Sequence, residues 1–251
     1  MKLTLIYCYI FLLIIAASAC KKDSAGDNAS LRIISYTEDI TAIGGRTVET
    51  YSVEYDAQNR ITSVASTNKH GARTVYQYSA ENSFTCDKYT DAVLLYHSVY
   101  FINNQSLIDS TWGREYKEAP YKSDTISGKF YYNEDKKLIK QKEFLNSTLV
   151  PPVLNRTINY QYDINGTLVK ETADDYESSY AYEKENKNTV QLQPFYFPSN
   201  DQLPSHSYIT RFGTTLETKH TYTFDDHKRV IGERAEQSDG RITILSYTYE
   251  K

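Results

Sequence analysis

The chain has 251 residues, of which 28 are Lys or Arg and 32 are Asp or Glu, so its formal net charge is −4. This length allows one or two domains with a buried core, and the near-neutral balance argues against a dedicated nucleic-acid-binding protein, which usually carries a basic stripe. Tyrosine is over-represented, with 24 residues against 9 Phe and 1 Trp. Together with abundant Thr, Ile and Val, it favours β-structure.

Residues 1–19 are typical of a bacterial export signal. Lys2 supplies the positive charge, and the uncharged stretch 3–17 is too short for a comfortable bilayer span. Residues 17–20 (Ala-Ser-Ala-Cys) resemble the lipobox of bacterial lipoproteins. The resemblance implies cleavage before Cys20 and lipid on that cysteine. The alternative is an ordinary signal peptide, which leaves Cys20 unmodified.

Residues 20–30 are predicted to be the lipid-bearing Cys20 and a flexible tether, because they are small and polar. Acyl chains contribute roughly 0.8 kcal/mol per buried methylene, so several chains on one cysteine hold a protein at a membrane without a spanning helix. We expect residues 31–251 to form a single domain. Within it, Cys86 is predicted to be a strand residue rather than a reactive thiol.

A repeated unit organises this domain. It has an apolar or aromatic residue at position −2, Tyr or Phe at position 0, often Asp or Asn at +1, three turn residues, often a base at +5, and an apolar residue at +6. Position 0 falls at Tyr55, Tyr78, Phe101, Tyr132, Tyr162 and Phe224, with a stretched copy at Tyr182 and a truncated copy at Tyr249.

This spacing predicts a β-hairpin with one aromatic face. Side chains alternate along a strand, so positions −2 and 0 share a face, and a three-residue loop places +1 opposite +5 and 0 opposite +6. Position +4 then requires a left-handed backbone, which suits Asn59, Asn82 and Gly166. Opposite charges at +1 and +5, as in Asp56 and Arg60, stabilise such a turn by ~0.2–1 kcal/mol.

The hairpins and the turn signals between them predict an all-β fold, a long antiparallel β-meander of roughly 14 to 17 strands. These signals lie at residues 44–45, 68–71, 127–128 and 239–240. So long a sheet must curve strongly or close into a barrel-like shell, with its tyrosine face inside. The alternate positions are polar, which argues against a membrane-spanning porin; they include Glu54, Gln77, Gln161, Thr223 and Thr248.

The segments 55–61 (Tyr-Asp-Ala-Gln-Asn-Arg-Ile) and 162–168 (Tyr-Asp-Ile-Asn-Gly-Thr-Leu) resemble the tyrosine–aspartate (YD) repeat of Rhs-type proteins. With its export signal and size, the chain resembles Bacteroidetes lipoproteins that carry a domain of unknown function with a porin-like fold. The resemblance covers nearly the whole mature chain. It implies a curved meander or barrel and supplies no catalytic residues.

Two stretches interrupt the repeat, residues 145–155 and residues 193–206. The second contains Phe195, Tyr196 and Phe197, which are candidates for stacking on a sugar or a partner. Trp112, at the edge of a predicted irregular stretch over 109–124, is a further candidate. The alternatives are that the three aromatics plug one end of the sheet and that Trp112 belongs to the core.

The sequence contains no phosphate loop, nucleophile elbow, dinucleotide fingerprint or zinc-protease motif, so we expect neither a cofactor nor an enzyme. His220 and His227 flank two aspartates of a predicted turn, which splays such ligands apart, so no metal site is expected. The acidic run 174–177 is predicted to be a solvated turn. Ser24, Ser110 and Thr125 match a short O-glycosylation pattern of exported Bacteroidetes proteins.

We therefore predict a non-enzymatic binding or scaffold lipoprotein of the cell envelope, anchored by lipid at the outer membrane, on a side that the sequence does not decide. Its expected partners are the membrane and a glycan or another envelope protein. Three alternatives stay open: a carbohydrate-binding lipoprotein that uses the loop aromatics, a glycoside hydrolase with two convergent carboxylates, and a carrier of apolar ligands in a hollow barrel.

Overall fold

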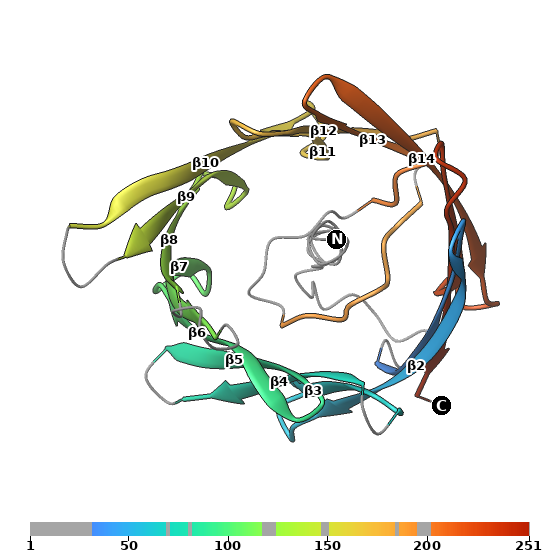
Figure 1. Ribbon diagram of the computed structural model, residues 1–251, viewed down its shortest axis with the longest axis horizontal. Coiled ribbons are helices and arrows are strands. Elements are labelled where there is room, and N and C mark those ends of the chain that lie inside the picture. The colour runs from blue at the N-terminus through green and yellow to red at the C-terminus, as the bar shows by residue number, and fades with distance from the viewer. Residues whose placement is uncertain are drawn as a thin grey trace.

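The computed structural model describes residues 32–68, 71–79, 82–116, 124–146, 151–183, 186–194 and 202–250. These residues form sixteen β-strands that pair in sequence order, and Figure 1 shows the strands arranged in a ring. Within the same residues, no helix is long and apolar enough to cross a membrane. The strands are β1 (Ile33–Ala42), β2 (Gly45–Tyr55), β3 (Ile61–Ser66), β4 (Ala72–Tyr78), β5 (Ser83–Thr90), β6 (Val93–Ile102), β7 (Ile108–Glu115), β8 (Asp124–Tyr132), β9 (Leu138–Asn146), β10 (Val153–Tyr162), β11 (Leu168–Thr172), β12 (Glu177–Ala181), β13 (His206–Arg211), β14 (Thr214–Phe224), β15 (Val230–Gln237) and β16 (Ile242–Tyr249).

The ring closes because β1 pairs with both β2 and β16. Tyr36 of β1 lies opposite Tyr51 of β2 and Tyr247 of β16. Its ring stacks on that of Tyr51 with centroids 4.8 Å apart and lies 6.3 Å from that of Tyr247. The predicted fold class is therefore confirmed, and the sheet is a closed antiparallel barrel.

The hairpins have the predicted geometry. Tyr55 pairs with Ile61, the amide of Asp56 donates to the carbonyl of Arg60 at 2.9 Å, and Asn59 at position +4 has a φ of 66°. The same pairing of 0 with +6 occurs at Tyr78↔Phe84, Ile102↔Ile108, Tyr132↔Leu138, Tyr162↔Leu168 and Phe224↔Val230. Position +4 has a positive φ in these copies too, at Asn82, Ser106, Lys136, Gly166 and Lys228.

The third copy begins one residue later than predicted. Ile102, not Phe101, occupies position 0, and Phe101 points to the other face and is 46% exposed. Asn103 then stands at +1, where its side-chain oxygen accepts hydrogen bonds from the amides of Gln105 and Leu107 at 2.9 and 3.1 Å. The prediction was wrong because the pattern required an aromatic residue at position 0, whereas any large apolar side chain can fill the buried face.

In five of the six hairpins a β-bulge follows position +6. In the first, Tyr55 pairs with Ile61 but Glu54 pairs with Ser63, so the register skips one residue. The same shift occurs in the copies that begin at Ile102, Tyr132, Tyr162 and Phe224. A bulge bends and twists a strand pair, so its regular recurrence favours closure of the sheet.

The aromatic face points into the barrel. The buried core cluster joins Ile33 of β1 and Phe84 of β5 to Val230 of β15, and strands so far apart around the ring can share a cluster only on its inner side. Four tyrosines of the predicted stripe are buried: Tyr76, Tyr180, Tyr247 and Tyr249, with exposed fractions of 6%, 9%, 5% and 7%. The tyrosine stripe is therefore confirmed as the inner lining.

The alternate positions face outward and carry polar side chains, together with the exposed aromatic residues Phe101, Trp112 and Tyr131. The five residues predicted to face water pair with polar or small residues of the neighbouring strand: Glu54↔Ser63, Gln77↔Thr85, Gln161↔Lys170, Thr223↔Gly232 and Thr248↔Ser35. Ion pairs join charged residues on this face, as between Arg46 and Asp39 at 2.6 Å and between Lys170 and Glu177 at 2.9 Å.

Three stretches predicted to be irregular are more regular than expected. The predicted turn at Ser127-Gly128 lies within β8, where a Cβ on Gly128 would come within 2.8 Å of the Thr111 methyl carbon. This glycine therefore allows close packing between strands rather than a turn. Residues 109–115 belong to β7. Within the predicted loop 145–155, residues 145–146 belong to β9 and residues 153–155 to β10, and Leu145 pairs with Val153.

Candidate binding site at the repeat end of the barrel

The six repeat turns lie at one end of the barrel, which we call the repeat end. They join β2 to β3, β4 to β5, β6 to β7, β8 to β9, β10 to β11 and β14 to β15. In an antiparallel meander, every second connection falls on the same side of the sheet. The connection between β12 and β13, residues 182–205, belongs to this end as well, and the remaining connections form the far end.

Each repeat turn is stabilised by its residue at +1. In the first turn, one carboxylate oxygen of Asp56 accepts hydrogen bonds from the amides of Gln58 and Arg60 at 3.0 and 2.9 Å. The other oxygen accepts one from Nε of Arg60 at 2.7 Å. Asp225 and Arg229 repeat this arrangement in the turn between β14 and β15. The predicted pairing of +1 with +5 is thus confirmed at these two turns.

Neighbouring turns are joined by a contact that we call a seam. In a seam, the tyrosine hydroxyl at position 0 donates to the carbonyl of the preceding +6 residue, as Tyr78 does to Ile61 at 2.7 Å. In several seams the preceding base at +5 also covers the tyrosine ring. Arg60 lies 4.1 Å above the centroid of Tyr78, and further pairs are Arg32 with Tyr55, Lys137 with Tyr162 and Arg229 with Tyr249.

The seam between the turns of Tyr78 and Ile102 lacks both the tyrosine hydrogen bond and the base that covers the ring. Ser83 stands at +5 in place of a base, and Ile102 stands at 0 in place of a tyrosine. Elsewhere, Leu107 and Thr167 also replace the base, but the tyrosines that follow them keep their hydrogen bonds to Ile108 and Leu168 at 2.8 and 2.7 Å. Phe224 also lacks a hydroxyl at position 0, but it follows the longer connection 182–205 rather than a repeat turn. Between two of the described repeat turns, the seam at Ile102 is the one that lacks both parts.

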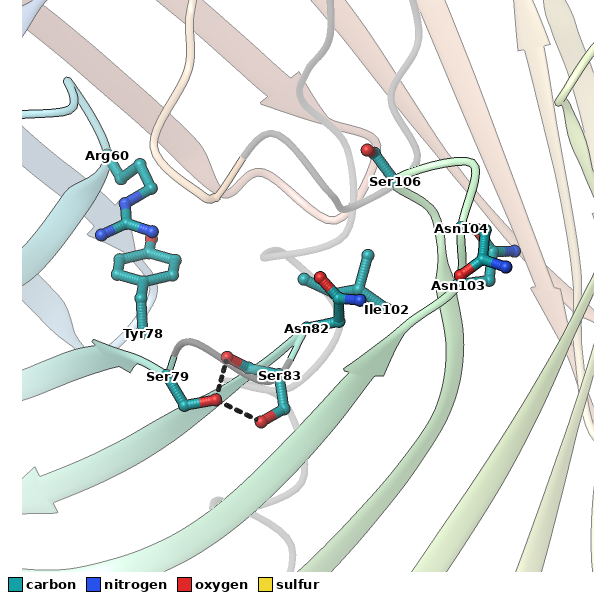
Figure 2. A pocket seen from close by; sticks show the side chains of 9 residues that line it. All are labelled: Arg60, Tyr78, Ser79, Asn82, Ser83, Ile102, Asn103, Asn104 and Ser106. Atoms are coloured by element: carbon teal, nitrogen blue, oxygen red, sulfur yellow. Dashed lines mark hydrogen bonds between the residues drawn. The ribbon is translucent and has the colours of Figure 1, made fainter.

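A pocket of about 380 Å³ occupies the incomplete seam. Figure 2 shows Arg60 and Tyr78 on one side and the turn after Ile102 on the other. Ser79 and Ser83 lie below, with their hydroxyls 2.7 Å apart. The lining residues are Arg60, Tyr78, Ser79, Asn82, Ser83, Ile102, Asn103, Asn104 and Ser106. We call this pocket the notch.

Part of the connection 182–205 packs inside the repeat end. Val190 and Leu203, at 3% and 5% exposure, belong to the same core cluster as residues of the barrel wall. The Thr189 hydroxyl accepts a hydrogen bond from the amide of Val230 at 2.9 Å. Phe195, Tyr196 and Phe197 lie outside the described residues, so their predicted role in binding or plugging is not tested.

Three inward side chains form a hydrogen-bonded chain that sequence reasoning missed. Ser207 Oγ of β13 lies 2.9 Å from Nε2 of His220 of β14, and Nδ1 of His220 lies 2.8 Å from Oε1 of Glu233 of β15. This is the order of groups in a nucleophilic triad. However, Ser207 is 7% exposed, between Tyr180 and Thr218 at 9% and 3%. A substrate would have to displace these buried neighbours, so we interpret the chain as a network that satisfies buried polar groups.

A buried carboxyl group lies among tyrosines toward the far end. Glu171 of β11 is 7% exposed, and burial raises its pKa to about 7, although hydrogen bonds with Tyr180 and Tyr176 lower it. Another inward carboxylate, Glu143, pairs with Arg156 at 2.8 Å. The two acids therefore have different environments, and sequence gave no signal that distinguished either of them.

The remaining predicted sites are dispersed. Trp112 faces outward on β7 and is 37% exposed, so the alternative that placed it in the core is wrong. Ser110 and Thr125 lie on β7 and β8 rather than in loops. Cys20 and Ser24 lie outside the described residues. Lipidation, glycosylation and binding by these residues stay predictions.

Other sequence candidates have structural roles. Cys86 is 4% exposed, and burial raises the pKa of its thiol to about 11, in agreement with the prediction of an unreactive strand residue. His220 faces the interior, whereas the amide of His227 donates to the Asp225 carboxylate in a turn. No group of three or more potential metal ligands occurs among the residues that the structure describes.

Comparison with known proteins identifies the fold alone. No family model and no curated protein matches the chain. A porin-like protein from Bacteroides uniformis ATCC 8492 is similar with a TM-score of 0.61 and 14% identity, over 88% of this chain and 98% of that chain. Another from Bacteroides vulgatus ATCC 8482 is similar with a TM-score of 0.50 and 13% identity, over 87% of this chain and 98% of that chain. The porin-like fold is thus confirmed, while the YD repeat and the lipid anchor stay predictions.

Proposed function

We propose that the protein is a lipid-anchored, non-enzymatic binding or scaffold module of the cell envelope, held at the outer membrane, with its barrel in water beside the bilayer. The observation that carries this proposal is the polar outer face of the barrel. A spanning barrel carries an apolar band toward lipid and a polar interior. Here the buried cluster with its tyrosines faces inward, and the outward rings of Trp112 and Tyr131 lie beside the cations Arg114 and Lys142.

Charged residues on the outer face make insertion of the barrel into a bilayer unfavourable. Lys or Arg on the lipid face of a barrel costs about 2–4 kcal/mol at the bilayer midplane. Lys140 and Lys142 of β9 both pair with outward-facing residues of β8, Tyr131 and Lys129. Together with the outward ion pairs, these residues oppose insertion. The anchor then falls to Cys20, which the sequence places after an export signal.

The experiment is release of the barrel from its anchor. A specific protease site is placed in the tether between residues 24 and 29 of the full chain, and membranes are treated with that protease without detergent. Release of the barrel into the aqueous phase is expected. Retention in the membrane would contradict the proposal, because it would mean that the barrel itself is inserted. Metabolic labelling with an alkyne fatty acid, lost in Cys20→Ala, tests the lipid.

The absence of enzymatic activity is tested at Ser207. A fluorophosphonate probe, which reacts with activated serines, is expected to leave the protein unlabelled. Labelling that disappears in Ser207→Ala and in His220→Ala would overturn the non-enzymatic proposal. Under our interpretation, Ser207→Ala instead lowers the thermal stability, since it removes the hydrogen-bond partner of Nε2 of His220 and leaves the bond to Glu233 in place.

A further inference from the structure

We propose that the notch between the turns of Tyr78 and Ile102 binds a neutral saccharide unit. This inference rests on the proposed binding function and specifies the site and the chemical class of ligand. The notch is formed by the departure of one repeat copy from the pattern of the others, and its lining determines what it can hold.

The shape of the notch follows from three shortened side chains. Ser79 stands where Asp56 and Asp225 stand in other copies, Ser83 replaces the base at +5, and Ile102 replaces the tyrosine at 0. In a complete seam, long side chains lie between neighbouring turns, as Arg229 does over the ring of Tyr249 at 4.5 Å. Here the resulting volume of about 380 Å³ lies at the lower end of the range for small-molecule sites, about 300–1,000 Å³.

The described part of the lining is polar and carries little charge. Hydroxyl and amide side chains contribute most of it: Ser79, Ser83 and Ser106 with Asn82, Asn103 and Asn104. Such groups both donate and accept hydrogen bonds, as the hydroxyls of a sugar do. Among the described lining residues the one charged side chain is that of Arg60, which pairs with Asp56 at 2.7 Å and is therefore less available to a phosphate or an acidic ligand. An apolar ligand is disfavoured by the same amide groups, which it would leave unpaired.

The notch is also accessible, and backbone hydrogen bonds join the described residues that line it. Asn82, Asn104 and Ser106 are exposed, so a ligand can reach them from the repeat end. The backbone beneath them is fixed by the hydrogen bond from the amide of Ile102 to the carbonyl of Asn82 at 2.7 Å. The amide of Ser106 donates to the carbonyl of Asn103 at 3.0 Å. Pre-organised polar groups lower the entropic cost of binding.

The test is saturation-transfer NMR and calorimetry on the full chain with maltotetraose, cellotetraose, mannotetraose, galactotetraose and chitotetraose, with inorganic phosphate as the charged comparison. We expect at least one oligosaccharide to bind and phosphate not to compete. The decisive variant is Ser83→Arg with Ile102→Tyr, which completes the seam in the manner of Arg60 and Tyr78. We expect it to fold and to lose at least tenfold in affinity.

A smaller variant covers the case in which the filled seam does not fold. Asn104→Ala with Ser106→Gly removes two polar groups at turn positions +2 and +4, and glycine suits the φ of 63° at Ser106. We expect a loss of at least threefold. The matched control is Glu134→Ala with Lys136→Gly, at +2 and +4 of the next turn, where φ is 61°. We expect no change in affinity from the control.

The outcomes separate this inference from the proposed function. Absence of binding by all five oligosaccharides, or binding that is unchanged in the completed seam, would overturn the assignment of the notch. Neither result would affect the release of the barrel from its tether. Retention of the barrel in the membrane would overturn the proposed function even if a saccharide binds.

Discussion

The two ends of the barrel are built on different principles. At the repeat end, six turns of equal length share a left-handed residue at +4, and in five of them the side-chain oxygen of Asp or Asn at +1 accepts hydrogen bonds from turn amides. At the far end, the connections differ in length. Exposed large side chains occur at tips of both ends, at Ile43 and Phe212 of the far end and at Ile164 of the repeat end. The repeat end fixes the register of the sheet, because a slip by one residue would turn the tyrosines outward. At the far end, the connections can differ in length because the repeat turns already set the register.

The largest expected effect is a loss of stability on truncation of a buried side chain near the repeat end, compared with truncation of an exposed one at the far end. Phe84→Ala removes a ring that is 1% exposed and stacked on Tyr100 with centroids 4.8 Å apart, and we expect it to lower the free energy of unfolding by about 3–5 kcal/mol. Val93→Ala, at the far end and 57% exposed, should change it by less than about 0.5 kcal/mol. Urea denaturation measures both, and equal effects would contradict the comparison.

A pH dependence is expected from the far half of the barrel. Because burial raises the pKa of Glu171 from 4.5 to about 7, the folded state holds this proton more tightly than the unfolded state. Its contribution to stability is therefore fully present below pH 4.5 and is lost as the pH rises to about 7, by roughly 2–3 kcal/mol. Glu171→Gln should flatten the stability profile between pH 5 and 8. An unchanged slope would show that other groups cause it.

The left-handed turn position provides a smaller effect. Gly166 has a φ of 77° and room for a Cβ, whose nearest neighbour would be the Lys137 side chain at 3.5 Å. Gly166→Ala should therefore cost about 1–2 kcal/mol through backbone conformation alone. Gly44→Ala is the control, because Gly44 has no positive φ and its Cβ would meet nothing within 4 Å. A thermal shift of equal size in both variants would argue against a special role for position +4.

The smallest effect concerns a single seam. Tyr78→Phe removes the hydroxyl that donates to the Ile61 carbonyl at 2.7 Å and should cost about 1 kcal/mol. Tyr131→Phe changes an outward ring that is 42% exposed and should have almost no effect. If the two substitutions are equivalent in thermal denaturation, the seams do not stabilise the repeat end.

The repeat end was largely predictable because its signal is local. The spacing from Tyr55 to Ile61 defines the turn, the pairing and the buried face with no knowledge of distant strands. The rest depends on long-range contacts. The chain of Ser207, His220 and Glu233 exists only because the register of three strands aligns it. The notch was not predicted for a different reason. It arises where the side chains are smaller than those of the other repeat copies, and a pattern defined by the residues that recur does not indicate a space left by small ones. Ile102 is an example. Because it stands where other copies have a tyrosine, position 0 of this copy was predicted one residue too early, at Phe101.

The central claim is that the outer face of the barrel contacts water rather than lipid. Its most direct test measures which of the two surrounds outward-facing residues. Spin labels on cysteines introduced at Gln77, Gln161 and Thr223, outward positions on three strands, are examined in native membranes by power-saturation EPR. The account predicts faster collision with a water-soluble nickel complex than with oxygen at all three positions. Faster collision with oxygen at these positions would place them in lipid and contradict a barrel that lies in water.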